Sequence, residues 1–116
     1  MQRADLVVHG VGRADSMAQR RHLSVEALET LKMHRAVGEA FGDFFNLEGK
    51  TVLQTSTVSL GIGKAYKESK MVAVAAGEHK AEAIVAACRH ETHDSLITDE
   101  AAAQKIAALL GGQFGK

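Results

Sequence analysis

Continuous apolar runs that end at glycine are the strongest pattern in the chain. Residues 5–12 (DLVVHGVG) form one such run, and residues 71–76 form a second that is followed by Gly77. Residues 95–97 (SLI) form a shorter third run, which is followed by Thr98 instead of glycine. A strand of a parallel sheet is buried on both faces and therefore lacks the apolar and polar alternation of a half-exposed strand. The pattern predicts three parallel strands, with residues 5–12 buried on both faces.

Apolar positions at helical spacing follow the second and third of these runs. One predicted helical face carries Ala81, Ile84, Val85 and Cys88. Residues 98–100 (TDE) supply an N-cap and two acidic residues for another helix. The apolar stripe of that helix consists of Ala102, Ile106, Leu109 and Leu110, and the helix ends at residues 111–112 (GG). The order strand, helix, strand, helix predicts a right-handed β-α-β unit.

The middle of the chain gives weaker signals. Ser24 is predicted to cap a helix that carries Val25, Leu28 and Leu31. Residues 36–45 are apolar and rich in phenylalanine, so we expect them to be strand-like in part. We expect residues 41–45 to lie in the core rather than to form a stacking platform. Residues 46–49 predict a turn, residues 51–55 a short strand and residues 59–69 a helix.

Length and composition limit the classes of protein to consider. The chain has 116 residues, of which 46% are hydrophobic and 24% charged, as expected for one globular domain. Its net charge is zero, which gives no overall electrostatic footprint for nucleic acid. The single cysteine excludes an internal disulfide. No apolar run reaches the ~20 residues of a membrane span and the start lacks signal-peptide zones, so we expect a cytoplasmic protein with no membrane partner.

The three predicted strands are fewer than a complete doubly wound sheet contains, which is normally about five or six. We therefore predict an α/β fold in which residues 1–116 form the second half of a doubly wound, mainly parallel, Rossmann-like sheet. An edge at residues 6–11 or at residues 72–76 would then stay unpaired. Because unpaired edges and bare apolar faces attract partners, we expect the chain to associate with its other half or with a second copy.

The strongest candidate for chemistry is the turn at residues 77–80 (GEHK), where a strand ends at Gly77 and a helix begins. Free N–H groups at a helix start favour an anion. Lys80 would lie in the first turn, where a cation is unfavourable by about 0.3–1 kcal/mol. A bound phosphate would remove this conflict. Alternatively, Lys80 is a solvated side chain that Glu78 and Glu82 balance.

A second candidate is the adjacent pair Arg20 and Arg21. Two guanidinium groups can hold a second phosphate through paired hydrogen bonds. The alternative is a solvated loop.

Other motifs do not support a site. Residues 10–15 (GVGRAD) lack the third glycine of a dinucleotide fingerprint and predict a plain turn, and Ala65 breaks the P-loop pattern that residues 61–64 (GIGK) suggest. His90 and His93 are three positions apart instead of four and have no evident third ligand, so we predict no metal site. We expect Cys88 to belong to the core and not to act as a nucleophile.

Three stretches together resemble a known family. They are residues 7–21 (VVHGVGRADSMAQRR), residues 36–42 (AVGEAFG) and residues 71–87 (MVAVAAGEHKAEAIVAA). They resemble the SorC/DeoR-like bacterial transcriptional repressors, in particular the branch that regulates central glycolytic genes. The resemblance covers roughly residues 5–110. Each stretch alone is a weak signal, whereas the three together are specific.

The resemblance implies a sugar-binding domain similar to glucosamine-6-phosphate isomerases, without a cofactor. It implies a phosphorylated sugar such as fructose 1,6-bisphosphate as the effector, with Gly77 and Lys80 at one phosphate and the pair Arg20 and Arg21 reaching the ligand from a loop. Glu39 would accept hydrogen bonds from sugar hydroxyls. Effector binding would modulate self-association, as a dimer or as a tetramer of the full-length protein, and binding to operator DNA.

The chain departs from the family pattern in two respects. It has no helix-turn-helix and lacks the first half of the sugar domain, so residues 1–116 are expected to be the C-terminal portion and to reach operator DNA only through the absent N-terminal domain. A sugar-phosphate isomerase on the same fold is the alternative function, with Glu39 as its only candidate base. An assembly module without a sugar ligand is a third. We predict a non-enzymatic, effector-sensing domain.

Overall fold

The computed structural model describes residues 6–55, 70–91 and 93–111. The helix predicted over residues 59–69 and the motif at residues 61–64 lie outside these ranges. The elements in chain order are β1 (Leu6–Gly10), β2 (Gly12–Arg13), α1 (Ala14–Arg20), α2 (Val25–Met33), β3 (Ala36–Ala40), β4 (Asp43–Asn46), β5 (Thr51–Gln54), β6 (Lys70–Val74), the 3-10 turn η1 (Glu78–Lys80), α4 (Ala81–His90), β7 (Ser95–Ile97) and α5 (Glu100–Leu109). Among the described helices, none combines the length and the apolar character needed to cross a bilayer.

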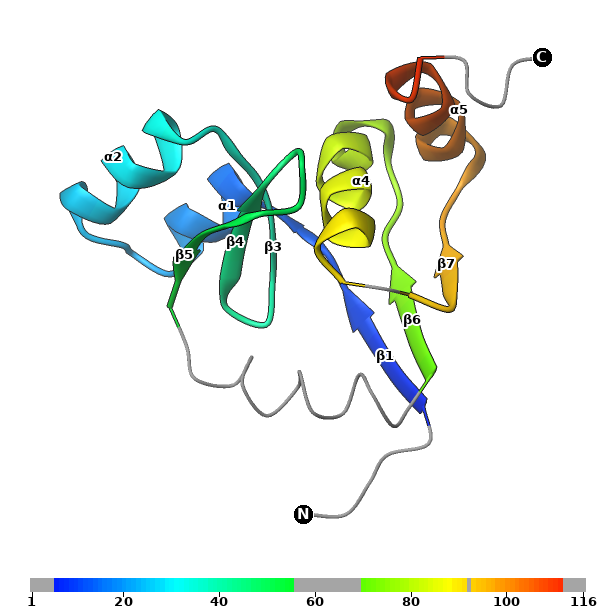
Figure 1. The fold of residues 1–116 in the computed structure, drawn as a ribbon, viewed down its shortest axis with the longest axis horizontal. Helices are drawn as coiled ribbons and strands as arrows, with labels where there is room; N and C mark the ends of the chain where they lie inside the picture. Colours follow the sequence, from blue (N-terminus) through cyan, green and yellow to red (C-terminus); the bar gives the residue numbers. More distant parts are fainter. Residues whose placement is uncertain (1–5, 56–69, 92, 112–116) are drawn as a thin grey trace.

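A three-stranded parallel sheet in the order β1-β6-β7 confirms the predicted α/β fold (Figure 1). Its register pairs Leu6 with Lys70 and Gly10 with Val74. The connection from β6 through α4 to β7 is the β-α-β unit that the sequence predicts. Because β6 is paired on both sides, the unpaired edge of the described sheet is at the first of the two predicted positions, residues 6–11, and not at residues 72–76. Among the described strands, β1 and β7 are the edges of this sheet.

One face of the parallel sheet is buried and the other is exposed. Ala73, which pairs with His9, packs against Ile84 of α4 on the buried face. On the opposite face Leu6 is 55% and Val8 57% exposed. The prediction that residues 5–12 are buried on both faces is therefore wrong, because no described element covers the face that carries these two side chains.

A second sheet, with antiparallel strands in the order β2-β3-β4-β5, arises from the segment that the sequence predicts only as partly strand-like. β3 and β4 form a hairpin with positive φ at both turn residues, 55° at Phe41 and 88° at Gly42. Such a pair of angles belongs to a tight turn whose twist matches the flanking strands. The turn brings β4 alongside β3, so that Gly38 pairs with Phe45 and Glu39 pairs with Phe44.

The antiparallel sheet is covered on both faces, as Phe44 and Phe45 show. Both side chains are fully buried, but they belong to different core clusters because neighbouring residues of a strand point to opposite faces. Phe45 packs with residues of α4, and Phe44 packs with residues of α1 and α2. α4 therefore lies between the two sheets (Figure 1). The expected core position of residues 41–45 is confirmed for these two phenylalanines.

The predicted helix cap at Ser24 is confirmed, because its hydroxyl accepts a hydrogen bond from the Ala27 backbone N–H at 3.1 Å. The cap of α5 is Asp99 and not the preceding Thr98, since the Asp99 carboxylate accepts a hydrogen bond from the Ala102 N–H at 2.9 Å. The prediction for Cys88 is wrong, because this residue is exposed. Ala83, Ile84, Ala86 and Ala87 form the buried face of α4, and Cys88 lies outside that face.

Candidate functional site

An ion pair joins two of the residues that the sequence selects. Arg21 follows directly after α1, and Glu39 lies in β3. The Arg21 guanidinium donates a hydrogen bond to Glu39 Oε2 at 2.9 Å. The Glu39 side chain is only 5% exposed, whereas that of Arg21 is 37% exposed. The pair therefore connects a buried carboxylate to a cation that still meets water.

The backbone of the hairpin holds the same carboxylate from a second direction. The Gly42 N–H donates to Glu39 Oε2 at 2.8 Å. The other oxygen, Oε1, lies 3.6 Å from the position that a Cβ would take at Gly12. That Cβ would also lie 2.6 Å from Met17 Cγ, so a larger residue at this position would displace the Met17 side chain. The β3–β4 turn and Arg21, the residue that follows α1, together position the Glu39 side chain.

The turn at Gly77 and Lys80 lies where the sequence predicts, between β6 and α4. Gly77 has a φ of 104°, which favours glycine, and Lys80 is the N-cap residue of α4. The Gly77 N–H donates to Asp99 Oδ2 at 3.2 Å, so this N–H group already has an acceptor. The Lys80 side chain makes no hydrogen bond or ion pair within the described residues. The cation at the helix start therefore keeps the electrostatic conflict that the sequence indicates.

Asp99 links this turn to α5. One carboxylate oxygen caps the helix through Ala102, and the other accepts from Gly77. These two N–H groups, that of Ala102 first, lower the pKa of the Asp99 carboxyl. The carboxylate thus fixes the geometry of the Gly77 turn. The sequence identifies Asp99 only as part of a helix cap, because the contact to Gly77 depends on the β6–β7 pairing.

Four of the five predicted site residues fall into two groups. Arg21 and Glu39 are bonded to each other, and Gly77 and Lys80 belong to one turn. Arg20 is exposed and has no hydrogen bond or ion pair with any described residue. The structure does not connect the two groups by any contact between these side chains.

A cavity of about 260 Å³ lies next to the Gly77 turn, where β1 and β6 end. Its lining residues are Arg13, Asp15, Ala36, Val37, His79, Glu82 and Ala83. Sequence analysis missed Arg13 and His79 as cavity residues, although both follow strands that end in glycine-containing turns. Arg13 is paired with Asp15 at 2.6 Å, and this pair is exposed. Because the carboxylates of Asp15 and Glu82 oppose the positive charge of Arg13, the charges that line this cavity do not favour an anionic ligand.

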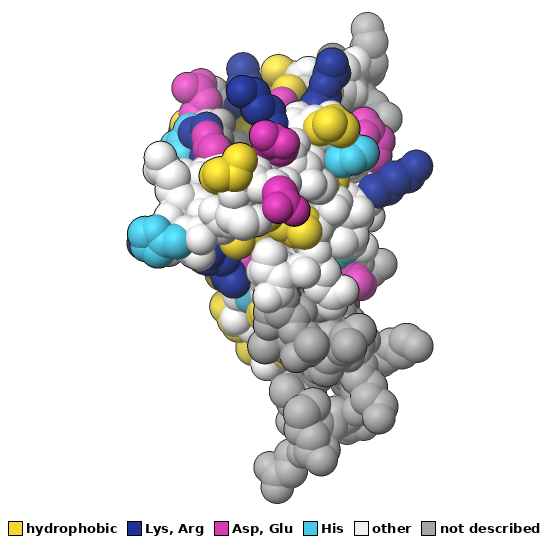
Figure 2. Space-filling view, turned by 90° about the vertical axis from the view of Figure 1, so that its left-hand side faces the viewer, with side chains coloured by type: hydrophobic (Ala, Val, Ile, Leu, Met, Phe, Trp, Pro, Cys, Tyr) yellow, Lys and Arg dark blue, Asp and Glu magenta, His cyan; other side chains and the backbone are white. Residues whose placement is uncertain are grey.

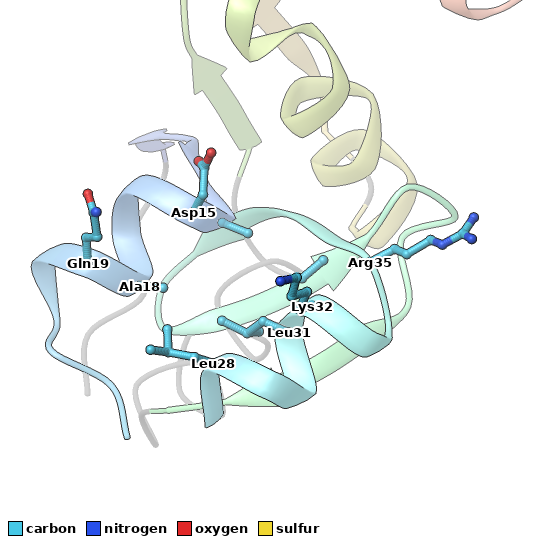
Figure 3. A pocket seen from close by; sticks show the side chains of 9 residues that line it. Asp15, Ala18, Gln19, Leu28, Leu31, Lys32 and Arg35 are labelled. Carbon is cyan, nitrogen blue, oxygen red and sulfur yellow. The ribbon is translucent and has the colours of Figure 1, made fainter. Parts of the chain in front are cut away.

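A larger cavity of about 430 Å³ lies between α1 and α2 (Figure 3). Ala18, Leu28 and Leu31 form part of an apolar wall, and polar side chains including Lys32 and Arg35 line it as well. A third cavity, of about 400 Å³, lies between η1 and α5. None of the three is lined by Arg21, Glu39 or Lys80.

Charges of both signs are distributed over the surface. Figure 2 shows acidic, basic and apolar side chains intermixed on one face of the molecule. The described part of that face has no continuous basic area of the kind that binds a nucleic-acid backbone. This distribution fits a chain with 14 basic and 14 acidic residues.

His90 and His93 do not share a site. His90 hydrogen-bonds to the Gly49 carbonyl oxygen and lies 3.6 Å from Asp43 Oδ2, while His93 contacts His9. No group of three or more His, Cys, Asp or Glu side chains within the described ranges is arranged to hold a metal ion.

Known proteins are similar to this chain in sequence and in fold. The Sugar-bind family model, a sugar-binding domain, matches residues 1–108. The chain is 44% identical over 104 residues to the Central glycolytic genes regulator of Priestia megaterium and 40% identical over 103 residues to the regulator of the same name from Bacillus subtilis. Each alignment covers 89% of this chain and 30% of the relative.

The crystal structure of a SorC family transcriptional regulator from Enterococcus faecalis superposes with a TM-score of 0.80 at 42% identity, covering 89% of this chain and 42% of that one. These proteins are named regulators and not enzymes, which agrees with the prediction of a non-enzymatic domain. The predicted resemblance to SorC/DeoR-like regulators is thus confirmed, although the chain spans only 30% of the length of its two curated relatives. Since the family model matches residues 1–108, the chain belongs to the Sugar-bind family of sugar-binding domains.

Proposed function

We propose that this chain is the effector-sensing part of a transcriptional regulator of glycolytic genes and that it binds a phosphorylated sugar such as fructose 1,6-bisphosphate. The observation that carries the proposal is the Arg21–Glu39 pair, in which a buried carboxylate is bonded to a partly exposed guanidinium. A sugar phosphate presents hydroxyl donors and an anion, and these two groups complement a carboxylate and a guanidinium. The names of the similar regulators support the regulatory role.

Glu39 is placed to recognise hydroxyl groups. Its Oε2 accepts hydrogen bonds from Arg21 and from Gly42, which fixes the orientation of the carboxylate plane. A carboxylate has about four lone-pair sites, so it accepts further donors after these two bonds are made. In the proposed complex, sugar hydroxyls donate to Glu39 and the Arg21 guanidinium lies beside the ligand.

Lys80 is the proposed phosphate contact at the start of α4. Its ammonium group has no acceptor among the described residues, and it lies at a helix end that itself favours anions. A phosphate at this turn would satisfy both the ammonium and the helix end. Gly77 contributes by its positive φ, which allows the chain to turn from β6 into η1.

An isomerase would use Glu39 differently. A general base must take a proton from a substrate carbon, and it needs a carboxylate that is ready to accept it. In the structure the Glu39 carboxylate already accepts hydrogen bonds from a guanidinium and from a backbone N–H. These contacts favour recognition of a ligand over proton abstraction.

The remaining parts of the proposal concern the whole regulator. The chain spans 30% of the length of its curated relatives, so binding of the whole regulator to DNA is part of this proposal. We propose that effector binding alters self-association, between dimer and tetramer, and thereby operator binding. A cytoplasmic location fits this role, since sugar phosphates and DNA meet there.

Calorimetric titration with fructose 1,6-bisphosphate tests the proposal. A charge-assisted contact contributes about 1.5–3 kcal/mol, so Lys80→Ala is expected to lower affinity at least about tenfold while leaving the fold intact. Lys32→Ala is the matched control, because Lys32 is an exposed lysine on α2 that lines the cavity between α1 and α2. Equal affinities of the two variants and the unsubstituted chain would exclude Lys80. Absence of any heat with the sugar phosphate would contradict the proposed function.

A further inference from the structure

Two histidines from distant parts of the sequence meet at one point. His9 lies in β1, and His93 lies in the segment that connects α4 to β7. Their Nε2 atoms are 2.8 Å apart. Both side chains are partly buried, and the His9 ring also packs against Phe41, with ring centroids 4.8 Å apart. The pair thus connects β1, the β3–β4 turn and the segment after α4.

The other ring nitrogens define where the protons are. His9 Nδ1 lies 2.9 Å from the Gly10 carbonyl oxygen, and His93 Nδ1 lies 2.8 Å from the Glu91 carbonyl oxygen. A carbonyl oxygen only accepts, so each Nδ1 carries a proton. In two neutral rings both Nε2 atoms are then unprotonated, and two lone pairs face each other at hydrogen-bond distance. A cation between the rings, either a proton or a metal ion, removes this conflict.

The surroundings match those of histidines that bind metal ions. Such histidines almost always donate the second ring N–H to a carboxylate or a backbone carbonyl, which fixes the tautomer and directs the lone pair at the metal. His9 and His93 both have this arrangement. The carbonyl of Glu91, the C-cap residue of α4, lies at a helix end where positive charge is favoured.

We propose that His9 and His93 form a binding site for a divalent transition-metal ion of the zinc class. Imidazole nitrogen is a preferred ligand of these metals. Two Zn–N bonds of about 2.0–2.1 Å at the tetrahedral angle place the nitrogens about 3.3 Å apart. The rings must therefore separate slightly from their present 2.8 Å. Within the described residues no third His, Cys, Asp or Glu side chain joins the pair.

Isothermal titration of the chain with Zn²⁺ tests the site, with Mg²⁺ as the control ion because magnesium prefers oxygen ligands. We expect one Zn²⁺ per chain and no Mg²⁺ uptake at this site. His9→Gln and His93→Gln are each expected to weaken Zn²⁺ binding at least about tenfold, since loss of even an outer partner typically costs about 10–100-fold in affinity. His34→Gln is the matched control, because His34 is exposed at the end of α2. Equal Zn²⁺ affinity in all three variants would overturn the proposal.

Imidazole nitrogen NMR of the unsubstituted chain gives a second readout that does not depend on a variant folding. Zn²⁺ is expected to shift the Nε2 resonances of His9 and His93 and to leave those of His34 in place. A shift of all three would show nonspecific binding and would contradict the site. The site would also be contradicted if the Nε2 resonances of His9 and His93 did not respond to Zn²⁺ and showed a proton shared between the two rings. In that case the cation between the rings is a proton.

Discussion

Removing either partner of the Arg21–Glu39 pair is expected to destabilise the fold by different amounts, because the two side chains differ in burial. In Arg21→Met the Glu39 carboxylate stays buried. It loses the hydrogen bond from Arg21 and keeps the one from the Gly42 N–H. In Glu39→Gln the guanidinium, already 37% exposed, is hydrated by water. The new amide oxygen also accepts from Gly42. The arginine substitution should therefore cost more.

The magnitudes follow from this asymmetry. Breaking a fully buried pair costs about 3–5 kcal/mol, whereas one hydrogen bond to a charged group contributes about 1.5–3 kcal/mol. Since Arg21 meets water, the lower range applies to Arg21→Met. We expect a loss of about 1.5–3 kcal/mol for Arg21→Met and of about 1 kcal/mol or less for Glu39→Gln.

Urea unfolding followed by circular dichroism measures both losses. With a slope of about 2 kcal/mol/M, a loss of about 2 kcal/mol lowers the midpoint by about 1 M. The double variant completes a thermodynamic cycle and isolates the coupling between the two side chains. The reasoning would be refuted if Glu39→Gln destabilised the chain as much as Arg21→Met while the slopes stayed equal.

Two further predictions concern the packing and the acid stability of the site. Gly38→Ala places a Cβ 2.6 Å from a ring carbon of the fully buried Phe45 and should lower the free energy of unfolding in urea by about 1–3 kcal/mol. Gly10→Ala is the control, because its Cβ would meet no atom closer than 3.8 Å, and it should lower the free energy of unfolding clearly less. The lowered pKa of Asp99 means that the unfolded chain binds this proton more tightly, so the stabilisation is complete above about pH 4 and is lost as the pH falls through the lowered value. Asp99→Asn keeps a good cap but should flatten the acid side of the melting temperature profile, and an unchanged acid limb would contradict the role of the carboxylate.

The features that the sequence predicts correctly are those that depend on neighbouring residues. The cap at Ser24 and the helices after Gly77 and after residue 98 need only local hydrogen bonds and spacing. The three parallel strands appear in the sequence as short apolar runs. The prediction that both faces of β1 are buried is wrong, because the burial of a strand depends on which other elements pack against it. The described elements cover only one face of β1.

The features that the sequence does not predict depend on distant contacts or unusual backbone angles. Nothing in the residue pattern indicates that Phe41 occupies a turn position with positive φ, since this conformation is disfavoured for a large side chain. Without that turn, the segment cannot be resolved into β3 and β4. The contact between His9 and His93 spans most of the chain and has no local signal. The family resemblance implies separate ligand contacts for Arg21 and Glu39, and only the structure shows that the two side chains form an ion pair.

The pairing of β1 with β6 has a consequence for biosynthesis. Leu6 reaches its partner Lys70 only after all the intervening residues have been made, which takes about 3–13 s at about 5–20 residues per second. The antiparallel strands β3, β4 and β5 are close in sequence and complete their pairing earlier. During this interval β1 lacks the partner strand that it has in the described structure. The apolar strand β1 is therefore a segment that a ribosome-associated chaperone would need to protect.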